Sequence, residues 1–306
     1  MRINAQEYAT ERQMRDYIVQ CESDFESQLN AAAERIISSP GVRTVTLSGP
    51  SSSGKTTTAK KLIRSFEAAG RRAHVVSIDD FYKNRADAAM KLSADGELKP
   101  DFETVASIDT DAFSDFAARV NSLGSKETLS VPVYDFNTGE RSGVRELDVR
   151  CGDIIIFEGI QAIYPEIVSE LSAEGNVSVH ISVCESLDVG GHIFTPDRIR
   201  LMRRLVRDYN YRAATPELTF YLWDEVRDNE INNIEPYTGG CDVLINSLLP
   251  YEVGVIAPYL CRVLGEVGAE SRYRNIARDI TESVADVKPI PIEYVPQGSV
   301  FCEFLH

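Results

Sequence analysis

A short glycine- and serine-rich stretch constrains this chain more than any other feature of its sequence. It reads Gly49-Pro-Ser-Ser-Ser-Gly-Lys-Thr-Thr57 and fits the pattern G-x-x-x-x-G-K-[ST]. Such a loop wraps a polyphosphate, because its glycines allow successive backbone N–H groups to point at the anion. A β-branched run at 42–47 precedes the loop, and an amphipathic run at 55–69 follows it. This order of strand, loop and helix predicts a phosphate-binding loop (P-loop). The alternative is a glycine-serine turn with a chance lysine.

The residue types in the loop predict how it would hold a phosphate chain. The helix that starts at Gly54 would add its positive end. Lys55 would reach the β- and γ-phosphates, and the Thr56 hydroxyl would ligate Mg²⁺. The residues expected to contact the nucleotide are Gly49, Ser51, Ser52, Ser53, Gly54, Lys55, Thr56 and Thr57.

Charge and cysteine content exclude several classes of protein. The 306 residues carry a formal net charge of −15, which would repel nucleic acid and anionic membranes. Six scattered cysteines show neither C-x-x-C spacing nor a neighbouring histidine cluster, a pattern typical of reduced cytoplasmic thiols rather than disulfides or zinc. No uncharged stretch is long enough to span a membrane, and the first residues do not form a signal peptide. We therefore expect a cytoplasmic protein with no nucleic-acid or membrane partner. The sequence leaves open whether the protein forms a homo-oligomer.

Strand and helix patterns alternate along the chain from residue 42. The predicted strands are 42–47, 73–78, 128–134, 153–157, 176–183 and 242–246. The predicted helices are 5–38, 55–69, 109–123, 198–212 and 216–227, with further helices after 246. The polar segment 83–101 reads as a loop with an Asp95-Gly96 turn. This order predicts an α/β fold of the P-loop NTPase type, a parallel sheet with helices on both faces. We expect a helical extension at 1–41 and one domain at 42–306, with a lid at about 190–235.

Two acidic residues follow predicted strands of this sheet. Asp79 comes directly after 73–78, and Glu158 directly after 153–157. Ligands bind at the carboxyl ends of strands in open α/β sheets, so both carboxylates would lie near the P-loop. Asp79 could accept the proton of an attacking hydroxyl and lie near Mg²⁺, which Glu158 would also hold. The alternatives are a helix-capping role for Asp79 and an ordinary strand end at Glu158.

The predicted helix 198–212 is strongly basic in an acidic chain. Its arginines recur at spacings of three and four, so several share one face. They are Arg198, Arg200, Arg203, Arg204, Arg207 and Arg212. One interpretation is a set of arginines that close over a transferring phosphoryl group. The other is a solvated face paired with Asp197, Asp208 and Glu217.

Aromatic and acidic residues alternate in two further stretches, Asp101-Phe-Glu103 and Pro132-Val-Tyr-Asp-Phe136. A ring that stacks on a base and a carboxylate that binds ribose hydroxyls would give this pattern. Ordinary core aromatics would give it too, and the residues alone favour that interpretation.

Taken in order, these stretches resemble the uridine kinase family of the phosphoribulokinase/uridine kinase group. The resemblance runs from about residue 42 to the C-terminus. Its motifs are Gly49–Thr57, Ile78-Asp-Asp-Phe-Tyr82, Asp101-Phe-Glu103, Pro132-Val-Tyr-Asp-Phe136, Phe157-Glu-Gly-Ile160 and Arg200–Asp208. The similarity is closest to a bacterial nucleoside-kinase branch in which a threonyl-tRNA-synthetase-like region often precedes the kinase. Residues 1–40 are too short to contain that region. The branch also has counterparts of Trp223–Arg227, Asp242–Ser247 and Val295–Phe304.

The resemblance implies transfer of the γ-phosphoryl group of ATP, with Mg²⁺, to the 5′-hydroxyl of a nucleoside. By position, Asp79 would be the general base, and Thr56 with Glu158 would form the Mg²⁺ site. The nucleoside contacts would be Tyr82, Glu103, Tyr134 and Arg204. Lys55, Arg207 and Arg212 would meet the phosphates.

This sequence differs from pyrimidine-specific members of the resembled family at two positions that bear on base specificity. Pyrimidine-specific members continue the Tyr-Asp-Phe run with a histidine that reads the base, and here Gly139 stands at that position. Glu103 is also one methylene longer than the aspartate of uridine–cytidine kinases. We expect a nucleoside kinase with uridine or cytidine as its substrate. The alternatives are a kinase of another small hydroxyl compound, such as a sugar phosphate or pantothenate, a nucleotide-binding regulatory protein, and a non-catalytic relative that serves as an interaction module.

Overall fold

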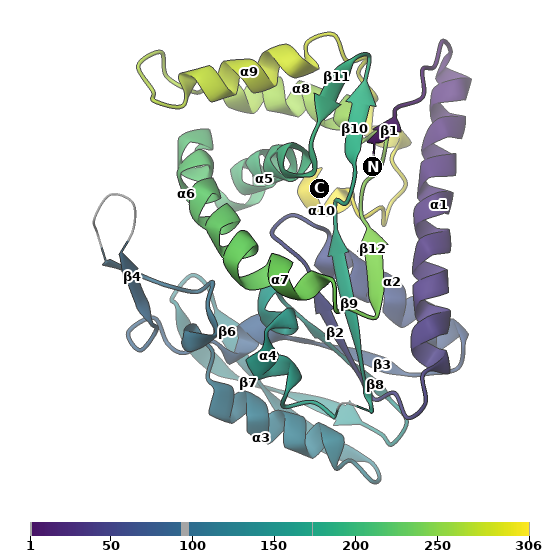
Figure 1. Ribbon diagram of the computed structural model, residues 1–306, viewed down its shortest axis with the longest axis vertical. Coiled ribbons are helices and arrows are strands. Elements are labelled where there is room, and N and C mark those ends of the chain that lie inside the picture. The colour runs from purple at the N-terminus through teal and green to yellow at the C-terminus, as the bar shows by residue number, and fades with distance from the viewer. Residues whose placement is uncertain (1, 93–97, 173, 306) are drawn as a thin grey trace.

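A parallel sheet of five strands forms the centre of the computed structural model, which describes residues 2–92, 98–172 and 174–305. The strands lie in the order β12-β9-β2-β8-β3 (Figure 1). They are β2 (Thr44–Ser48), β3 (Ala73–Ser77), β8 (Ile154–Glu158), β9 (Asn176–Ser182) and β12 (Val243–Asn246). The sequence predicted all five within one or two residues, because each is a short, largely apolar run of the kind found in a buried parallel strand.

Both faces of this sheet are buried, as the side chains of β8 show. Ile154 and Ile156 belong to one hydrophobic core, whereas Ile155 and Phe157 belong to another on the opposite face. All four are at most 1% exposed. Side chains alternate between the faces of a strand, so a strand that is apolar throughout needs cover on both sides. The predicted α/β fold with helices on both faces is confirmed.

The helices around the sheet fall into two sets. The longer ones are α1 (Glu11–Ser38), α2 (Lys55–Ala68), α3 (Thr110–Asn121), α5 (Pro196–Arg212), α6 (Pro216–Asn229), α8 (Glu252–Leu264) and α9 (Arg274–Val284). The short helical segments are η1 (Ile78–Phe81), η2 (Val105–Ser107), η3 (Ile160–Ile163), α4 (Pro165–Val168), η4 (Glu230–Ile234), α7 (Glu235–Thr238), η5 (Ile292–Tyr294) and α10 (Cys302–Leu305).

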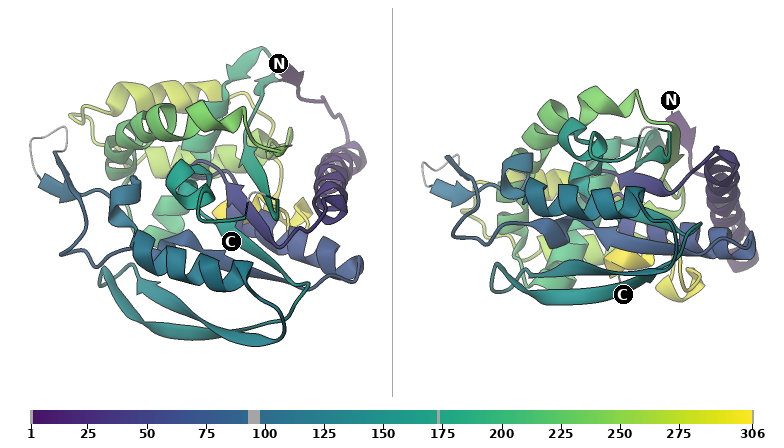
Figure 2. Two further views of the ribbon diagram at one scale, coloured as in Figure 1. Left: turned by 60° about the horizontal axis from the view of Figure 1, so that its bottom comes forward. Right: turned by 90° about the horizontal axis from the view of Figure 1, so that it is seen from below.

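Helix α1 packs on the same core as the sheet and stands along one edge of the molecule (Figure 2, purple). Its buried Ile18, Phe25 and Leu29 are at most 2% exposed. The helix begins at residue 11 rather than 5, because Thr10 and Gln13 form a capping box that satisfies the first backbone N–H groups.

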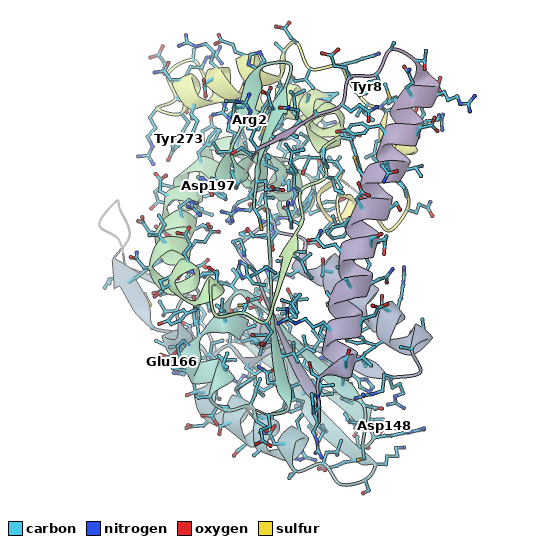
Figure 3. All side chains as sticks on the ribbon, turned by 45° about the vertical axis from the view of Figure 1, so that its right-hand side comes forward. Arg2, Tyr8, Asp148, Glu166, Asp197 and Tyr273 are labelled. Atoms are coloured by element: carbon cyan, nitrogen blue, oxygen red, sulfur yellow. The ribbon has the colours of Figure 1, made fainter. Side chains whose placement is uncertain are left out.

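Three smaller sheets surround the central one. They pair β6 (Glu127–Asp135) with β7 (Glu140–Val149), β4 (Met90–Leu92) with β5 (Leu98–Pro100), and β10 (Ser186–Val189) with both β1 (Arg2–Asn4) and β11 (His192–Phe194). The strand predicted at 128–134 is therefore β6, which lies outside the central sheet. Segment 83–101 is not a loop throughout, and its predicted Asp95-Gly96 turn lies outside the described residues. Asp148 in β7 lies at the other end of the molecule from Tyr8, which follows β1 (Figure 3).

Within the described ranges, no helix combines the length and the apolar character needed to cross a bilayer.

Candidate functional site

Three neighbouring strands bring the predicted phosphate and acid motifs to one edge of the sheet. Glu158, the last residue of β8, pairs with Leu47 of β2 on one side and with Ser77 of β3 on the other. The P-loop leaves β2 directly after this position, and Asp79 stands two residues beyond Ser77 in η1. Parallel strands end at a common edge, so the register places all three motifs together.

The P-loop has the backbone of an anion cradle. Gly54 at the start of α2 has φ of +91° and Ser52 has φ of +60°, both in the left-handed region. A side chain at Gly49 would collide with the backbone carbonyl of Ile181, so only glycine fits there. The buried hydroxyls of Ser52 and Ser53 have no hydrogen-bond partner among the described residues. Unsatisfied buried donors in such a cradle fit a bound phosphate chain.

Lys55 and two carboxylates lie within electrostatic range of one another beneath this cradle. The Lys55 ammonium donates to the carbonyl of Pro50 at 3.2 Å. Burial raises the pKa of Asp79, while Lys55 and Arg212 act in the opposite direction. Burial likewise raises the pKa of Glu158 to about 7; Lys55 opposes this shift, and the charges of Asp79 and Glu303 add to it. The structure therefore brings the predicted base, the predicted metal ligand and the P-loop lysine into one partly buried group.

The oxygens of this group suit Mg²⁺ in character, although they do not form a complete metal cage. No cluster of three or more His, Cys, Asp or Glu side chains in the described part of the chain is arranged to hold a metal ion. Mg²⁺ is usually held by one or two protein oxygens together with substrate phosphates and water. The exposed hydroxyl of Thr56 and the carboxylate of Glu158 match that partial role, with Asp79 nearby. Their assignment as metal ligands stays a prediction.

Three arginines of the basic helix, α5, brace the P-loop. Arg200 donates to the carbonyl of Ser51 at 3.2 Å, and Arg203 donates to the carbonyl of Ser52 at 3.2 Å. Arg204 donates to the hydroxyl of Ser51 at 2.9 Å. The three arginines are at most 8% exposed. A solvated face is therefore the wrong interpretation for them.

Two buried glutamates from distant elements neutralise this arginine row. Arg200 makes two bonds of 2.6 Å to Glu230 in η4. Arg203 makes bonds of 2.6 Å and 2.8 Å to Glu252 at the start of α8. Sequence reasoning missed both glutamates, because nothing local marks them as partners of α5.

Asp208 forms ion pairs with three arginines of the helix, whereas Arg198 pairs with Asp279 at 2.7 Å. Asp208 lies 3.2 Å from Arg204, 2.7 Å from Arg207 and 3.6 Å from Arg212. The four-residue spacing of Arg204, Asp208 and Arg212 is the signal that could have marked it as their common anchor. Arg212 keeps 58% of its side chain exposed, yet its charge reaches Asp79. Asp208 thus holds two predicted phosphate contacts, Arg207 and Arg212, beside the site.

The predicted acceptor residues form a wall next to Asp79. Tyr82 donates to the carbonyl of Phe102 at 2.8 Å, and its ring meets that of Tyr134 edge to face at 5.5 Å. The side chain of Gln161, fully buried in η3, donates to the Tyr82 hydroxyl at 2.7 Å. Sequence reasoning missed Gln161. Glu103 accepts a hydrogen bond from the Asn229 amide at 3.2 Å. Burial raises the pKa of Glu103, and the charge of the nearby Arg204 acts in the opposite direction.

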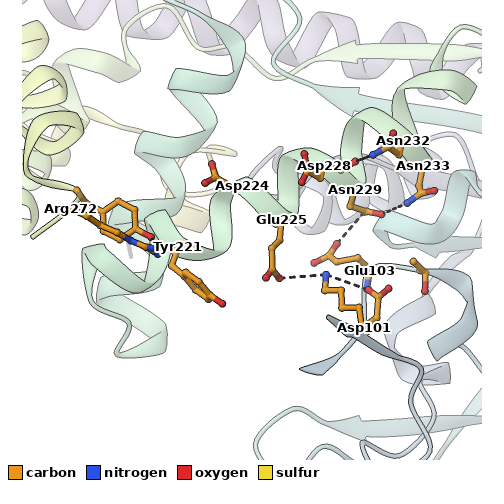
Figure 4. Close-up of a pocket in the computed structure, with 13 residues that line it drawn as sticks. Asp101, Glu103, Tyr221, Asp224, Glu225, Asp228, Asn229, Asn232, Asn233 and Arg272 are labelled. Carbon is orange, nitrogen blue, oxygen red and sulfur yellow. Dashed lines mark hydrogen bonds and ion pairs between the residues drawn. The ribbon is translucent and has the colours of Figure 1, made fainter. Parts of the chain in front are cut away.

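A cavity of about 710 Å³ opens beside Glu103, between the segment after β5 and helix α6 (Figure 4). Its walls hold more acidic than basic side chains. The acidic ones are Asp101, Glu103, Asp224, Glu225 and Asp228, and the basic ones are Lys91 and Arg272. Lys91 lies 3.5 Å from both Asp101 and Glu225. The excess of carboxylates makes the cavity a poor receptor for an anion.

The Arg85 side chain occupies the space next to Gly139, the residue that stands where pyrimidine-specific kinases of the resembled family have a histidine. Gly139 has φ of +74°, and a side chain there would meet the Arg85 guanidinium at 2.6 Å to Nε. The two residues also share a backbone hydrogen bond of 2.7 Å. The charge of Arg85 acts on the Tyr134 hydroxyl, whose pKa burial raises and Arg85 lowers. The structure thus places a guanidinium where a side chain at position 139 would project.

A P-loop on a doubly covered parallel sheet, with partly buried carboxylates and an arginine helix at its edge, defines an α/β protein of the P-loop kinase class. The model of the phosphoribulokinase / uridine kinase family matches residues 44–253, and the chain belongs to that family. The family implies use of ATP by a phosphotransferase.

The individual proteins that this chain resembles share less than a third of the aligned residues with it. A uridine kinase of Schizosaccharomyces pombe (strain 972 / ATCC 24843) is 31% identical over 175 residues, which span 56% of this chain and only 33% of that protein. A uridine kinase of Deinococcus deserti is 26% identical over 200 residues, 65% of this chain and 84% of that protein. A solved structure described as a possible uridine kinase from Bacillus stearothermophilus aligns with a TM-score of 0.44 at 19% identity. That alignment covers 72% of this chain and 99% of the other.

Proposed function

We propose that this protein transfers the γ-phosphoryl group of ATP to the 5′-hydroxyl of a nucleoside, with uridine or cytidine as the first candidate. The position of Asp79 carries the proposal. Its partly buried carboxylate lies between the P-loop lysine and the aromatic wall that begins three residues later at Tyr82. Curated relatives of this chain that act as uridine kinases add support.

In this mechanism Asp79 accepts the proton of the acceptor hydroxyl. Burial raises its pKa, which makes the ionised carboxylate a stronger base. Lys55, Arg207 and Arg212 stabilise charge on the transferring group, and Asp208 keeps the two arginines in place. When bound, Mg²⁺ would neutralise phosphate charge, with Thr56 and Glu158 as its protein ligands. Positioning and electrostatics supply most of the catalysis in such a site.

The acceptor side favours a neutral, hydroxyl-rich compound over an anionic one. A carboxylate such as Glu103 can accept hydrogen bonds from two neighbouring ribose hydroxyls. A sugar phosphate or pantothenate would bring negative charge toward the carboxylates of the cavity, which disfavours both. Uracil and cytosine both carry a ring carbonyl oxygen that could accept from Arg85, so that contact would not distinguish the two bases.

A panel of acceptors tests the proposal through ADP release from ATP and Mg²⁺. We expect turnover with uridine or cytidine, and little or none with ribose 5-phosphate or pantothenate. Mass spectrometry of the product should show a nucleoside 5′-monophosphate. Turnover with an anionic acceptor alone would contradict the proposal. ATP binding without any acceptor-stimulated turnover would favour the regulatory alternative.

A further inference from the structure

The C-terminal helix α10 sets a carboxylate on the P-loop. Glu303 accepts a hydrogen bond from the backbone N–H of Thr57 at 3.2 Å and another from the Thr57 hydroxyl at 3.0 Å. Thr57 directly follows the last motif residue, Thr56, in the first turn of α2, where backbone N–H groups of such loops hold the phosphates of a nucleotide. Glu303 therefore occupies two donors that a bound phosphate chain would use.

Buried side chains of neighbouring residues hold the backbone around Glu303 in place. Phe301 and Phe304 are fully buried, and the Arg203 guanidinium lies 5.1 Å from the centre of the Phe304 ring. Val300 packs so closely on Gly54 that no side chain would fit there. Glu303 itself is partly exposed. Rotation of this one side chain into solvent would free Thr57 while the backbone of α10 stays in place.

The electrostatics around Glu303 favour its release when a phosphate arrives. No ion pair joins it to a lysine or arginine within residues 2–92, 98–172 and 174–305. Its charge instead acts on the partly buried Glu158, in a protein with a net charge of −15. A phosphate oxygen and this carboxylate cannot share the Thr57 donors, since both are negative acceptors.

We propose that the Glu303 carboxylate competes with the donor nucleotide for phosphate-binding groups of the P-loop. The nucleotide must displace this carboxylate in order to bind. In the free protein the carboxylate accepts hydrogen bonds from the Thr57 donors, and it thereby weakens the binding of the nucleotide. This inference rests on the proposed donor site and is independent of the acceptor. It gives a function to a segment that lies beyond residues 44–253, the part matched by the family model.

Calorimetric titration with ATP and with inorganic pyrophosphate, without acceptor, tests this inference. Glu303→Gln keeps a side-chain oxygen for Thr57 and removes the charge, so we expect the dissociation constant of both probes to fall about tenfold. Glu303→Ala removes the competitor altogether and should tighten binding at least as much. Glu293→Gln, at an exposed glutamate on the same C-terminal segment, is the matched control and should bind like the wild type.

Unchanged or weaker binding by both Glu303 variants, at an unchanged melting temperature, would overturn the inference and leave the proposed function intact. Weaker binding with a lowered melting temperature in both variants would also overturn it, because Glu303 would then be a structural cap. Failure of every protein, wild type included, to bind either probe would overturn the donor site and the proposed function together.

Discussion

The buried pair of Arg203 and Glu252 provides a sharp test of how the P-loop is held. The two side chains are 0% and 1% exposed, and two bonds of 2.6 Å and 2.8 Å join them. Glu252→Gln keeps the shape of the side chain and removes its charge, so the guanidinium stays buried without a counterion. Breaking a buried ion pair from one side costs about 3–5 kcal/mol.

The lower end of that range applies here. Arg203 keeps three neutral acceptors, the carbonyl and hydroxyl of Ser247 and the carbonyl of Ser52, at 2.8 Å, 3.2 Å and 3.2 Å. We expect Glu252→Gln to lower the free energy of unfolding by about 3 kcal/mol. The melting temperature should fall by roughly 6–12 °C, since each kcal/mol is worth about 2–4 °C in a large domain.

Urea denaturation and thermal melting measure the loss, with Glu282→Gln as the control. Glu282 forms an exposed pair with Arg278 at 3.9 Å, and its loss should leave stability unchanged within error. The double variant Arg203→Met/Glu252→Gln removes the orphaned charge and should lose less than the two single variants summed. Additive losses, or a cost below 1 kcal/mol for Glu252→Gln, would refute the argument.

Two further predictions concern residues beside the P-loop. Burial and the charge of Lys55 lower the pKa of His180 to about 4, below its ordinary 6.5. The folded protein therefore binds fewer protons than the unfolded chain between these values, and stability falls as the pH drops from 6.5 to 4. His180→Asn should remove about 3 kcal/mol of that loss; equal pH profiles in urea melts of the two proteins would contradict this. Gly49→Ala should weaken ATP binding by at least about tenfold, because its methyl group meets the Ile181 carbonyl. Gly124→Ala, where the added methyl group meets open space, should bind ATP normally, and equal affinities of the two variants would argue against a close-packed cradle.

The sequence predicts those parts of the fold that depend on local patterns. The apolar run of β8 identifies a strand buried on both faces, and the glycines and lysine of the P-loop fix the turn into α2. The order of the strands in the sheet was not predicted, because it depends on pairing between residues far apart in the sequence. Strand β7 escaped prediction because its exposed, polar residues 140–149 carry no clear apolar face.

Long-range partners are what the sequence could not supply. Glu230, Glu252 and Glu303 lie 30, 49 and 246 residues along the chain from Arg200, Arg203 and Thr57, to which they are hydrogen-bonded. Only the fold brings such groups together, for example by packing α5 against α8 and α10. The arginine spacing in α5 showed that a shared face existed, but not that it was buried. The same limit applies to Arg85, whose position over Gly139 depends on how the β6–β7 hairpin folds back on the segment after η1.

The most direct test of the central claim is acceptor-dependent phosphoryl transfer by Asp79→Asn, compared with Asp80→Asn. The neighbouring Asp80 is a matched control, because its carboxylate lies toward Arg145 at 3.7 Å and not toward Lys55. With uridine and ATP, we expect kcat to fall at least about a hundredfold in Asp79→Asn, with ATP affinity kept, and far less in Asp80→Asn. Wild-type turnover in Asp79→Asn, or equal losses in both variants, would contradict Asp79 as the base for the acceptor hydroxyl.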